Sequence, residues 1–210
     1  MRVACIADLH GQIPTDVAPC DVLLIAGDLG PDDPRDAGAW LNDELAPWLR
    51  RQPAREIVAV AGNHDHLAVD SPASLRSLPW RFLEHETANV AGLRVAGSAW
   101  SPTFGVWPLQ ADDHELDALW RTIPDDAQIV LVHGPPFGHC DLTERGVHGG
   151  SRTLLRRLLE LPELRLVCTG HIHEGYGTTT LTTGALVVNA SLVDARLELV
   201  NEPIVVELQI

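Results

Sequence analysis

A short apolar run that ends directly in a polar or glycine-containing cluster occurs five times in this 210-residue chain, and this pattern constrains its fold most strongly. Such short runs, rich in Val, Ile and Leu and bounded by turn-forming residues, are typical of buried strands. Ligands of open α/β sheets gather beyond the carboxyl ends of the strands, so we expect the clusters to converge on one crevice. The predicted strands are 3–7, 22–26, 57–61, 129–132 and 166–168.

Helical and hairpin patterns separate these strands. The predicted helices are 35–51, 112–121 and 151–161, the predicted hairpins are 88–99 and 178–190, and a closing strand is predicted at 204–208. Pro47 is expected to kink or shorten the first helix. The alternation indicates an α/β (α+β) chain with mixed sheets. Because no internal repeat or flexible linker interrupts it, we expect a single domain over residues 1–210.

Composition excludes several classes of function. All 15 basic residues are arginines, so lysine-dependent chemistry such as Schiff-base catalysis or a phosphate-binding P-loop is excluded. The formal net charge of −14 disfavours duplex nucleic acid as a partner and favours a small anion held by cations.

Targeting and redox signals are weak. No apolar run approaches the roughly 20 residues that a membrane-spanning helix needs, and the first apolar run is too short for the core of a signal peptide. The four cysteines form no Cys-x-x-Cys pair, and two of them lie in apolar runs. We therefore predict a cytoplasmic protein with reduced cysteines and no membrane partner. The sequence indicates no oligomeric state.

The five clusters differ in weight. An Asp-x-His or a Gly-Asp is expected roughly once by chance in a chain of this composition. In contrast, Gly-His-x-His is expected about 0.04 times and Gly-Asn-His-Asp about 0.002 times, so these two clusters carry most of the information. In chain order the clusters are Asp8-Leu9-His10, Gly27-Asp28, Gly62-Asn63-His64-Asp65, His133-Gly134 and Gly170-His171-Ile172-His173.

This ordered set resembles the calcineurin-like metallophosphoesterase superfamily, in which five such blocks each close a strand. The resemblance covers residues 8–173 and implies a four-layer αββα sandwich of two mixed β-sheets flanked by helices. More narrowly, the segments 133–138, 170–177 and 189–191 are similar to the small metallophosphoesterase-domain-containing phosphodiesterases. Some of those proteins replace the first histidine of the last block by glycine, whereas this chain keeps His171.

The resemblance implies a centre of two divalent transition-metal ions. Mn²⁺ is favoured, with iron and zinc as alternatives, since such metals accept imidazole and carboxylate together. One ion would be held by Asp8, His10, Asp28 and His173, and the other by Asp28, Asn63, His133 and His171. Asp28 would bridge the two, about 3.5 to 4 Å apart.

The resemblance also assigns roles around the metals. A bridging hydroxide would attack phosphorus, His64 would act as general acid on the leaving oxygen, and Asp65 would support His64, with Asp32, Asp33 and Asp36 as rival orienting groups. The substrate would contact Asn63, His64, Phe137 and Tyr176. For the two aromatic residues, simple packing is an equal alternative.

Charge favours a diester among phosphate esters. The two ions bring four positive charges, of which Asp8, Asp28 and the hydroxide cancel three, and the remaining charge matches that of a phosphodiester. We therefore expect a dinuclear metal phosphodiesterase acting on a small nucleotide-like ester, such as a cyclic nucleotide. The alternatives are a phosphomonoesterase or protein phosphatase, disfavoured because no Arg precedes the Asn63 block, and a non-catalytic scaffold of the same fold. A DNA nuclease is disfavoured because the short acidic chain shows no additional DNA-binding region.

Overall fold

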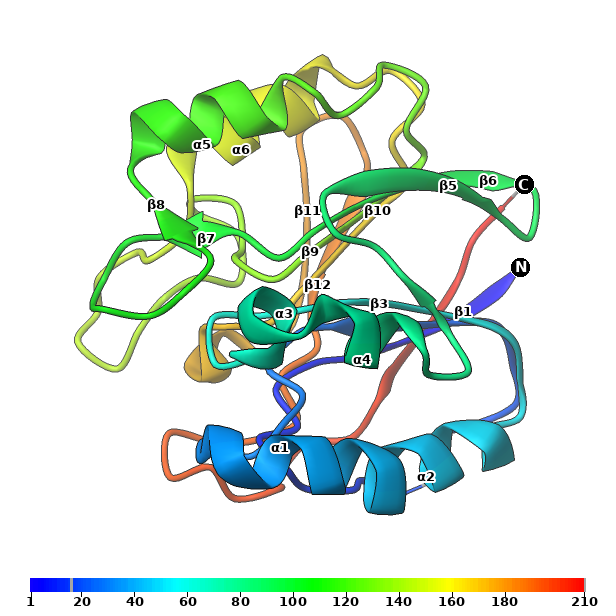
Figure 1. The fold of residues 1–210 in the computed structure, drawn as a ribbon. Helices are drawn as coiled ribbons and strands as arrows, with labels where there is room; N and C mark the ends of the chain where they lie inside the picture. Colours follow the sequence, from blue (N-terminus) through cyan, green and yellow to red (C-terminus); the bar gives the residue numbers. More distant parts are fainter. Residues whose placement is uncertain (16, 210) are drawn as a thin grey trace.

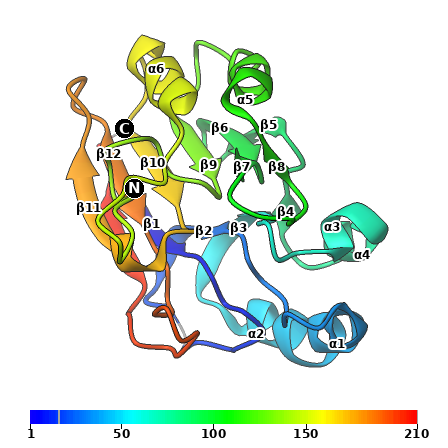
Figure 2. The ribbon, with the colours of Figure 1, turned by 90° about the vertical axis from the view of Figure 1, so that its left-hand side faces the viewer.

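Two β-sheets stacked face to face organise the chain, and helices cover both outer faces (Figure 1). The computed structural model describes residues 1–15 and 17–209. One outer layer contains α5 and α6, and the other contains α1 and α2 together with α3 and α4 (Figure 2). The arrangement confirms the predicted four-layer αββα sandwich of mixed sheets.

Each sheet combines parallel and antiparallel neighbours. The first sheet has the order β13-β1-β2-β3-β4, in which only the β13–β1 pair is antiparallel. In the second sheet, of order β11-β12-β10-β9-β6-β5, the hairpins β11–β12 and β5–β6 supply the antiparallel pairs. Both hairpins and the closing strand were predicted from the sequence.

The strands of the first sheet are β1 (Arg2–Ile6), β2 (Cys20–Ala26), β3 (Ala54–Val60), β4 (Arg81–Phe82) and β13 (Ile204–Glu207). Those of the second are β5 (Glu86–Val90), β6 (Leu93–Ser98), β9 (Ile129–Val132), β10 (Leu166–Thr169), β11 (Gly177–Thr180) and β12 (Leu186–Asn189). A short parallel pair, β7 (Ser101–Pro102) and β8 (Gln110–Ala111), lies apart from both. The helices are α1 (Pro34–Trp40), α2 (Ala46–Arg51), α3 (Leu67–Asp70), α4 (Pro72–Arg76), α5 (Asp113–Trp120) and α6 (Arg152–Glu160), with a π-helical turn η1 (Leu41–Leu45) and a 3₁₀ turn η2 (His173–Gly175).

Side-chain alternation along the strands builds three apolar layers. In β1, Val3 and Cys5 point between the sheets, whereas Ala4 and Ile6 point toward the helices of the first outer layer. The same period of two in β9 sends Ile129 inward and Val130 toward α5 and α6. Both faces of each central strand are therefore buried, which explains the continuous apolar runs in the sequence.

Local sequence sets the ends of the helices. Asp112 caps α5 and forms a capping box with Glu115, and the Ser151 hydroxyl accepts a hydrogen bond from the Leu154 amide at the start of α6. The first predicted helix, 35–51, is observed as α1, η1 and α2 in succession. It still ends at Arg51, so Pro47 does not shorten it. Pro47 lies in the first turn of α2, just after the π-helical turn, where its missing N–H is tolerated.

All four cysteines are free. Among residues 1–15 and 17–209, no helix has the length and apolar character required to cross a membrane.

Gly97 in β6 and Gly38 in α1 differ in the space around them, so a Gly→Ala change should have opposite effects on stability at the two positions. A Cβ on Gly97 would lie 2.5 Å from the Cβ of buried Leu83, so Gly97→Ala should lower the free energy of unfolding by about 1 to 3 kcal/mol. A Cβ on Gly38, inside α1, would meet nothing within 4 Å, so Gly38→Ala should raise it by about 0.5 to 1 kcal/mol. Urea unfolding of both variants tests this pair, and equal shifts would contradict the packing argument.

Candidate metal centre

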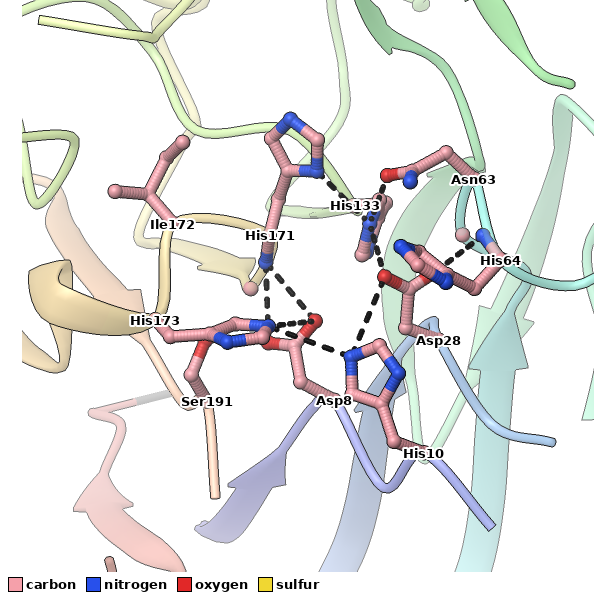
Figure 3. Close-up of polar contacts among 12 residues, drawn as sticks. Asp8, His10, Asp28, Asn63, His64, His133, His171, Ile172, His173 and Ser191 are labelled. Carbon is pink, nitrogen blue, oxygen red and sulfur yellow. Dashed lines mark hydrogen bonds and ion pairs between the residues drawn. The ribbon is translucent and has the colours of Figure 1, made fainter. Parts of the chain in front are cut away.

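The polar clusters that follow five strands converge at one edge of the sandwich (Figure 3). Asp8 and His10 follow β1, Asp28 follows β2, Asn63 and His64 follow β3, His133 follows β9, and His171 and His173 follow β10. Most of these side chains are buried; for example, Asp8 and His133 have no exposed surface. The residues predicted as metal ligands therefore come together in space.

One group of ligand atoms comes from Asp8, His10 and His173, which all lie within 4.8 Å of one another. The His10 Nε2 and His173 Nε2 atoms are 3.4 Å apart, and His173 Nε2 is 3.8 Å from Asp8 Oδ1. These are the side chains assigned to the first predicted metal, apart from Asp28.

A second group surrounds His133. Its Nε2 atom lies 3.0 Å from Asn63 Oδ1, 3.2 Å from His171 Nδ1 and 3.3 Å from Asp28 Oδ2. The same Asp28 oxygen is 3.8 Å from His10 Nε2 in the first group. Asp28 thus lies between the two groups, where a bridging carboxylate is required.

The donor set fits metal cations, because backbone carbonyls fix which histidine nitrogens face inward. His133 Nδ1 donates to the Ala26 carbonyl at 2.8 Å, and His173 Nδ1 donates to the Asp194 carbonyl at 3.1 Å. Each bond directs the Nε2 atom of its ring into the centre, where that atom offers a lone pair once it is deprotonated, as is usual for metal-binding histidines. Several lone pairs then face a common point, which a cation satisfies.

Electrostatics in the centre depend on Asp28. Burial acts to raise the pKa of its carboxyl, but the adjacent His133 and His10 hold that pKa well below its ordinary value. Burial acts to lower the pKa of His133, yet its ion pair with Asp28 raises it to about 9. For His171, burial and the neighbouring His133 lower the pKa to about 3. His171 is therefore already a neutral ligand at pH 7, whereas His133 must lose a proton to bind a metal.

A shell of hydrogen bonds holds the ligands in place. Asp8 accepts hydrogen bonds from the Ser191 hydroxyl and from the His171 amide, the latter at 3.0 Å. The side-chain amide of Asn189 donates to the carbonyl of Gly170 at 3.2 Å and of Ile172 at 2.8 Å. Ser191 and Asn189 were not predicted to support the ligands; they stood out only as part of the segment 189–191.

Close approach explains the glycines in the two most informative clusters. A Cβ on Gly62 would lie 2.2 Å from Asp28 Oδ1, and one on Gly170 would lie 2.4 Å from Asp8 Oδ2. Any larger residue at either position would push into a ligand carboxylate. The glycines of these motifs are thus part of the centre's geometry.

The ligands themselves carry backbone strain. Asp8, His10, Asp28 and His171 all have positive φ angles, between 44° and 72°. Such conformations cost about 1 to 3 kcal/mol each and are concentrated at functional sites.

His64 and Asp65 occupy different environments. His64 Nδ1 is 2.9 Å from Asp32 Oδ1, so Asp32, one of the rival orienting groups, contacts it. The buried Asp65 carboxylate instead accepts hydrogen bonds from the amides of Leu29, Gly30 and Gly62. Burial and the nearby Asp28 charge raise the Asp65 pKa to about 6. A catalytic role for Asp65 stays a prediction, and these contacts tie the loops that follow β2 and β3.

Aromatic residues flank the centre. Trp107, in the loop between β7 and β8, stacks on His64 with ring centroids 4.1 Å apart, and Phe104 of the same loop lies edge-on to His171 at 5.1 Å. Phe137 lines a cavity beside His171. The Tyr176 hydroxyl donates to the Glu202 carbonyl at 2.9 Å, and its ring lies outside that cavity's lining. Substrate contact by Phe137 and Tyr176 stays a prediction. Phe104 was not predicted from the sequence, because nothing in the sequence shows where its loop lies.

Comparison with known proteins gives a consistent picture. A family model described as calcineurin-like phosphoesterase matches residues 1–175. The chain is 29% identical to "Metallophosphoesterase domain-containing protein 1" of Homo sapiens over 99% of its own length and 71% of that protein. It is also 32% identical to a "Probable rhamnogalacturonate lyase C" from Emericella nidulans. That match covers 84% of this chain and 17% of the other protein. A solved dimetal phosphatase from Danio rerio shares the fold, with a TM-score of 0.58 at 12% identity, covering 90% of this chain and 86% of that one.

The raised pKa of His133 predicts a pH-dependent metal affinity. Because His133 is protonated below about pH 9 and binds a metal only when neutral, the affinity for Mn²⁺ should rise about tenfold per pH unit from pH 7 toward 9. Anaerobic competition against a chromogenic chelator, corrected for the chelator's own protonation, measures this slope. His114→Gln, at an exposed histidine on α5, should keep it. An affinity that does not change with pH would contradict the assignment of His133.

Proposed function

This chain belongs to the calcineurin-like phosphoesterase family, and from that premise we propose that it is a phosphodiesterase that hydrolyses a small nucleotide-like ester at two divalent metal ions. Membership indicates a hydrolase of phosphate esters. The observation that carries the proposal is the convergence of all seven predicted ligands, with Asp28 between the two groups. None of the seven is replaced, which disfavours a non-catalytic scaffold.

The ligand groups suggest how the metals are divided. Asp8, His10 and His173 would hold one ion, Asn63, His133 and His171 the other, and Asp28 both. We favour Mn²⁺, because the donors combine imidazole nitrogens with carboxylate and amide oxygens. When bound, the ions would polarise the phosphate and activate a water molecule for attack on phosphorus.

His64 is the proposed general acid. Its Nδ1 is held by Asp32, its ring lies on Trp107, and its backbone amide donates to Asp28 Oδ1 at 2.8 Å. These three contacts fix the ring beside the ligands and leave Nε2 to protonate the leaving oxygen. Asn63, next to His64, would contact both metal and substrate.

Charge supports a diester over a monoester. Asp8 and Asp28 are the two carboxylates of the predicted ligand set, so two divalent ions keep a positive field at the centre despite the acidic chain. Within residues 1–15 and 17–209, no arginine forms a hydrogen bond or ion pair with the seven ligands. A dianionic monoester would gain most from such a guanidinium, whereas a monoanionic diester needs it less.

The diester assignment predicts a substrate preference. With Mn²⁺, kcat/KM for bis(4-nitrophenyl) phosphate should exceed that for 4-nitrophenyl phosphate, and a chelator should abolish both rates. The initial release of 4-nitrophenol measures them. A preference for the monoester would overturn the diester assignment. A protein that takes up no metal, and shows no chelator-sensitive hydrolysis after reconstitution, would favour the scaffold alternative.

The role of His64 predicts a separation of rate from metal binding. His64→Ala should lower kcat by about 10² to 10⁴-fold while retaining the fold and both metals, because a general acid contributes about that much. Elemental analysis and circular dichroism accompany the kinetics, and His66→Ala, at the partly buried histidine two residues on, is the control. Loss of metal from His64→Ala would instead make His64 a ligand, as its place beside His10 and Asp32 also allows.

A further inference from the structure

A cavity of about 700 Å³ opens beside the centre on the side of His171. Its walls come from the β7–β8 region, which includes Phe104, and from the segment that leads into α6, which includes Phe137 and Arg152. Ile172, between two predicted ligands, also lines it, and its side chain points away from the ligand cluster (Figure 3). A group attached to a phosphate at the centre would therefore enter this cavity next.

We propose that this cavity binds the nucleoside part of the substrate, and that Phe104 and Arg152 set a preference for nucleoside esters over small alkyl esters. The inference rests on the proposed function, because it assumes that the phosphate of the substrate lies at the metal centre.

Phe104 is the first surface that such a group would meet. Its side chain is 62% exposed, although its ring contacts His171 at the edge of the centre. Trp107, from the same loop, stacks on His64 and so holds the loop over the ligands. An exposed phenyl ring fixed beside a reaction centre offers a face on which a base can stack.

Arg152 provides a second flat surface. Its guanidinium carbon lies over the Phe137 ring, 3.5 Å from the ring centroid, so the two groups form a cation–π pair. Arg152 forms no ion pair within the described part of the chain. It begins α6, where a cation interacts unfavourably with the helix dipole. The Phe137 ring is thus the contact that places Arg152 at the cavity, and the guanidinium face turned away from that ring offers a surface on which a base can stack.

The charge of the cavity selects a neutral group. Asp112 and Asp113 line it together with Arg152, so the formal charge of these three side chains is negative. His148 also lines it, with its Nδ1 2.7 Å from Asp141 Oδ1. A second phosphate in the cavity would meet two carboxylates, whereas a neutral heterocycle with polar edges would not be repelled. Aromatic faces with a few polar groups are typical of pockets for such ligands.

One wall of the cavity is fixed by Asp141. This carboxylate is 1% exposed and accepts hydrogen bonds from the amides of Gly138 and Gly150, each at 3.0 Å. A Cβ on Gly150 would lie 2.7 Å from the Phe137 amide nitrogen, which shows how tightly the segment closes on itself. The Phe137–Arg152 pair is thus held in place before a ligand arrives, which lowers the entropic cost of binding.

Two esters with the same leaving group test the proposal. Thymidine 5′-(4-nitrophenyl phosphate) and methyl 4-nitrophenyl phosphate differ only in the nucleoside, so their ratio of kcat/KM measures its contribution. In Phe104→Ala and in Arg152→Ala this ratio should fall about tenfold, because loss of one stacking surface typically costs about that factor. Phe104→Trp should keep the ratio. Val106→Ala and Arg145→Ala, exposed neighbours outside the cavity lining, should leave both rates unchanged.

A binding measurement separates this inference from the proposed function. Titration calorimetry of the Mn²⁺-loaded variants with AMP and with inorganic phosphate gives the affinity ratio without turnover, and metal content is checked in parallel. A fall of this ratio in both cavity variants supports the proposal. Ratios unchanged in both variants, with diester hydrolysis intact, would overturn it and leave the proposed function standing. If the wild-type protein hydrolyses neither ester, the diester function fails, and the calorimetric ratio alone decides about the cavity.

Discussion

The buried carboxylate of Asp28 is the interaction on which the rest of the structure depends. It lies at the end of β2 in the first sheet and contacts His133, which follows β9 in the second. A negative charge with almost no exposed surface is costly unless cationic or hydrogen-bonding groups surround it. The stacking of the two sheets brings those groups together, with His10 and the His64 amide completing the surroundings. The four-layer sandwich can thus be understood as the frame that makes this charge tolerable.

The same sandwich also supports backbone strain in the predicted metal ligands. Four ligand residues adopt positive φ angles, and the glycines before Asn63 and His171 leave no room for a side chain. Three apolar layers, which bury both faces of the central strands, offset these local costs. Stability is therefore concentrated in the sheets and reactivity at their edge.

The sequence predicts the frame well, and it predicts which polar residues come together at its edge, because both have local signals. Apolar runs mark the strands, and the rare clusters around Asn63 and His171 mark the ligands that follow them. The contacts that shape reactivity have no such signal. Ser191 meets Asp8 across 183 residues, and Phe104 and Trp107 lie in a loop whose path depends on the packed sheets. For Asp65, the position beside His64 in the sequence led to a prediction of catalytic support. In the structure its carboxylate accepts hydrogen bonds from three backbone amides.

The pairing of the first strand with the last segments of the chain has a consequence for biosynthesis. Asp8 accepts a hydrogen bond from the Ser191 hydroxyl, the Asp194 carbonyl orients His173, and β1 pairs with β13. During synthesis, Asp8 and β1 would therefore emerge from the ribosome well before the partners at residues 191–207. A chain that ends before Ser191 would leave Asp8 without this hydrogen bond and His173 without its orienting carbonyl, so the candidate centre could be completed only after this late segment has been made.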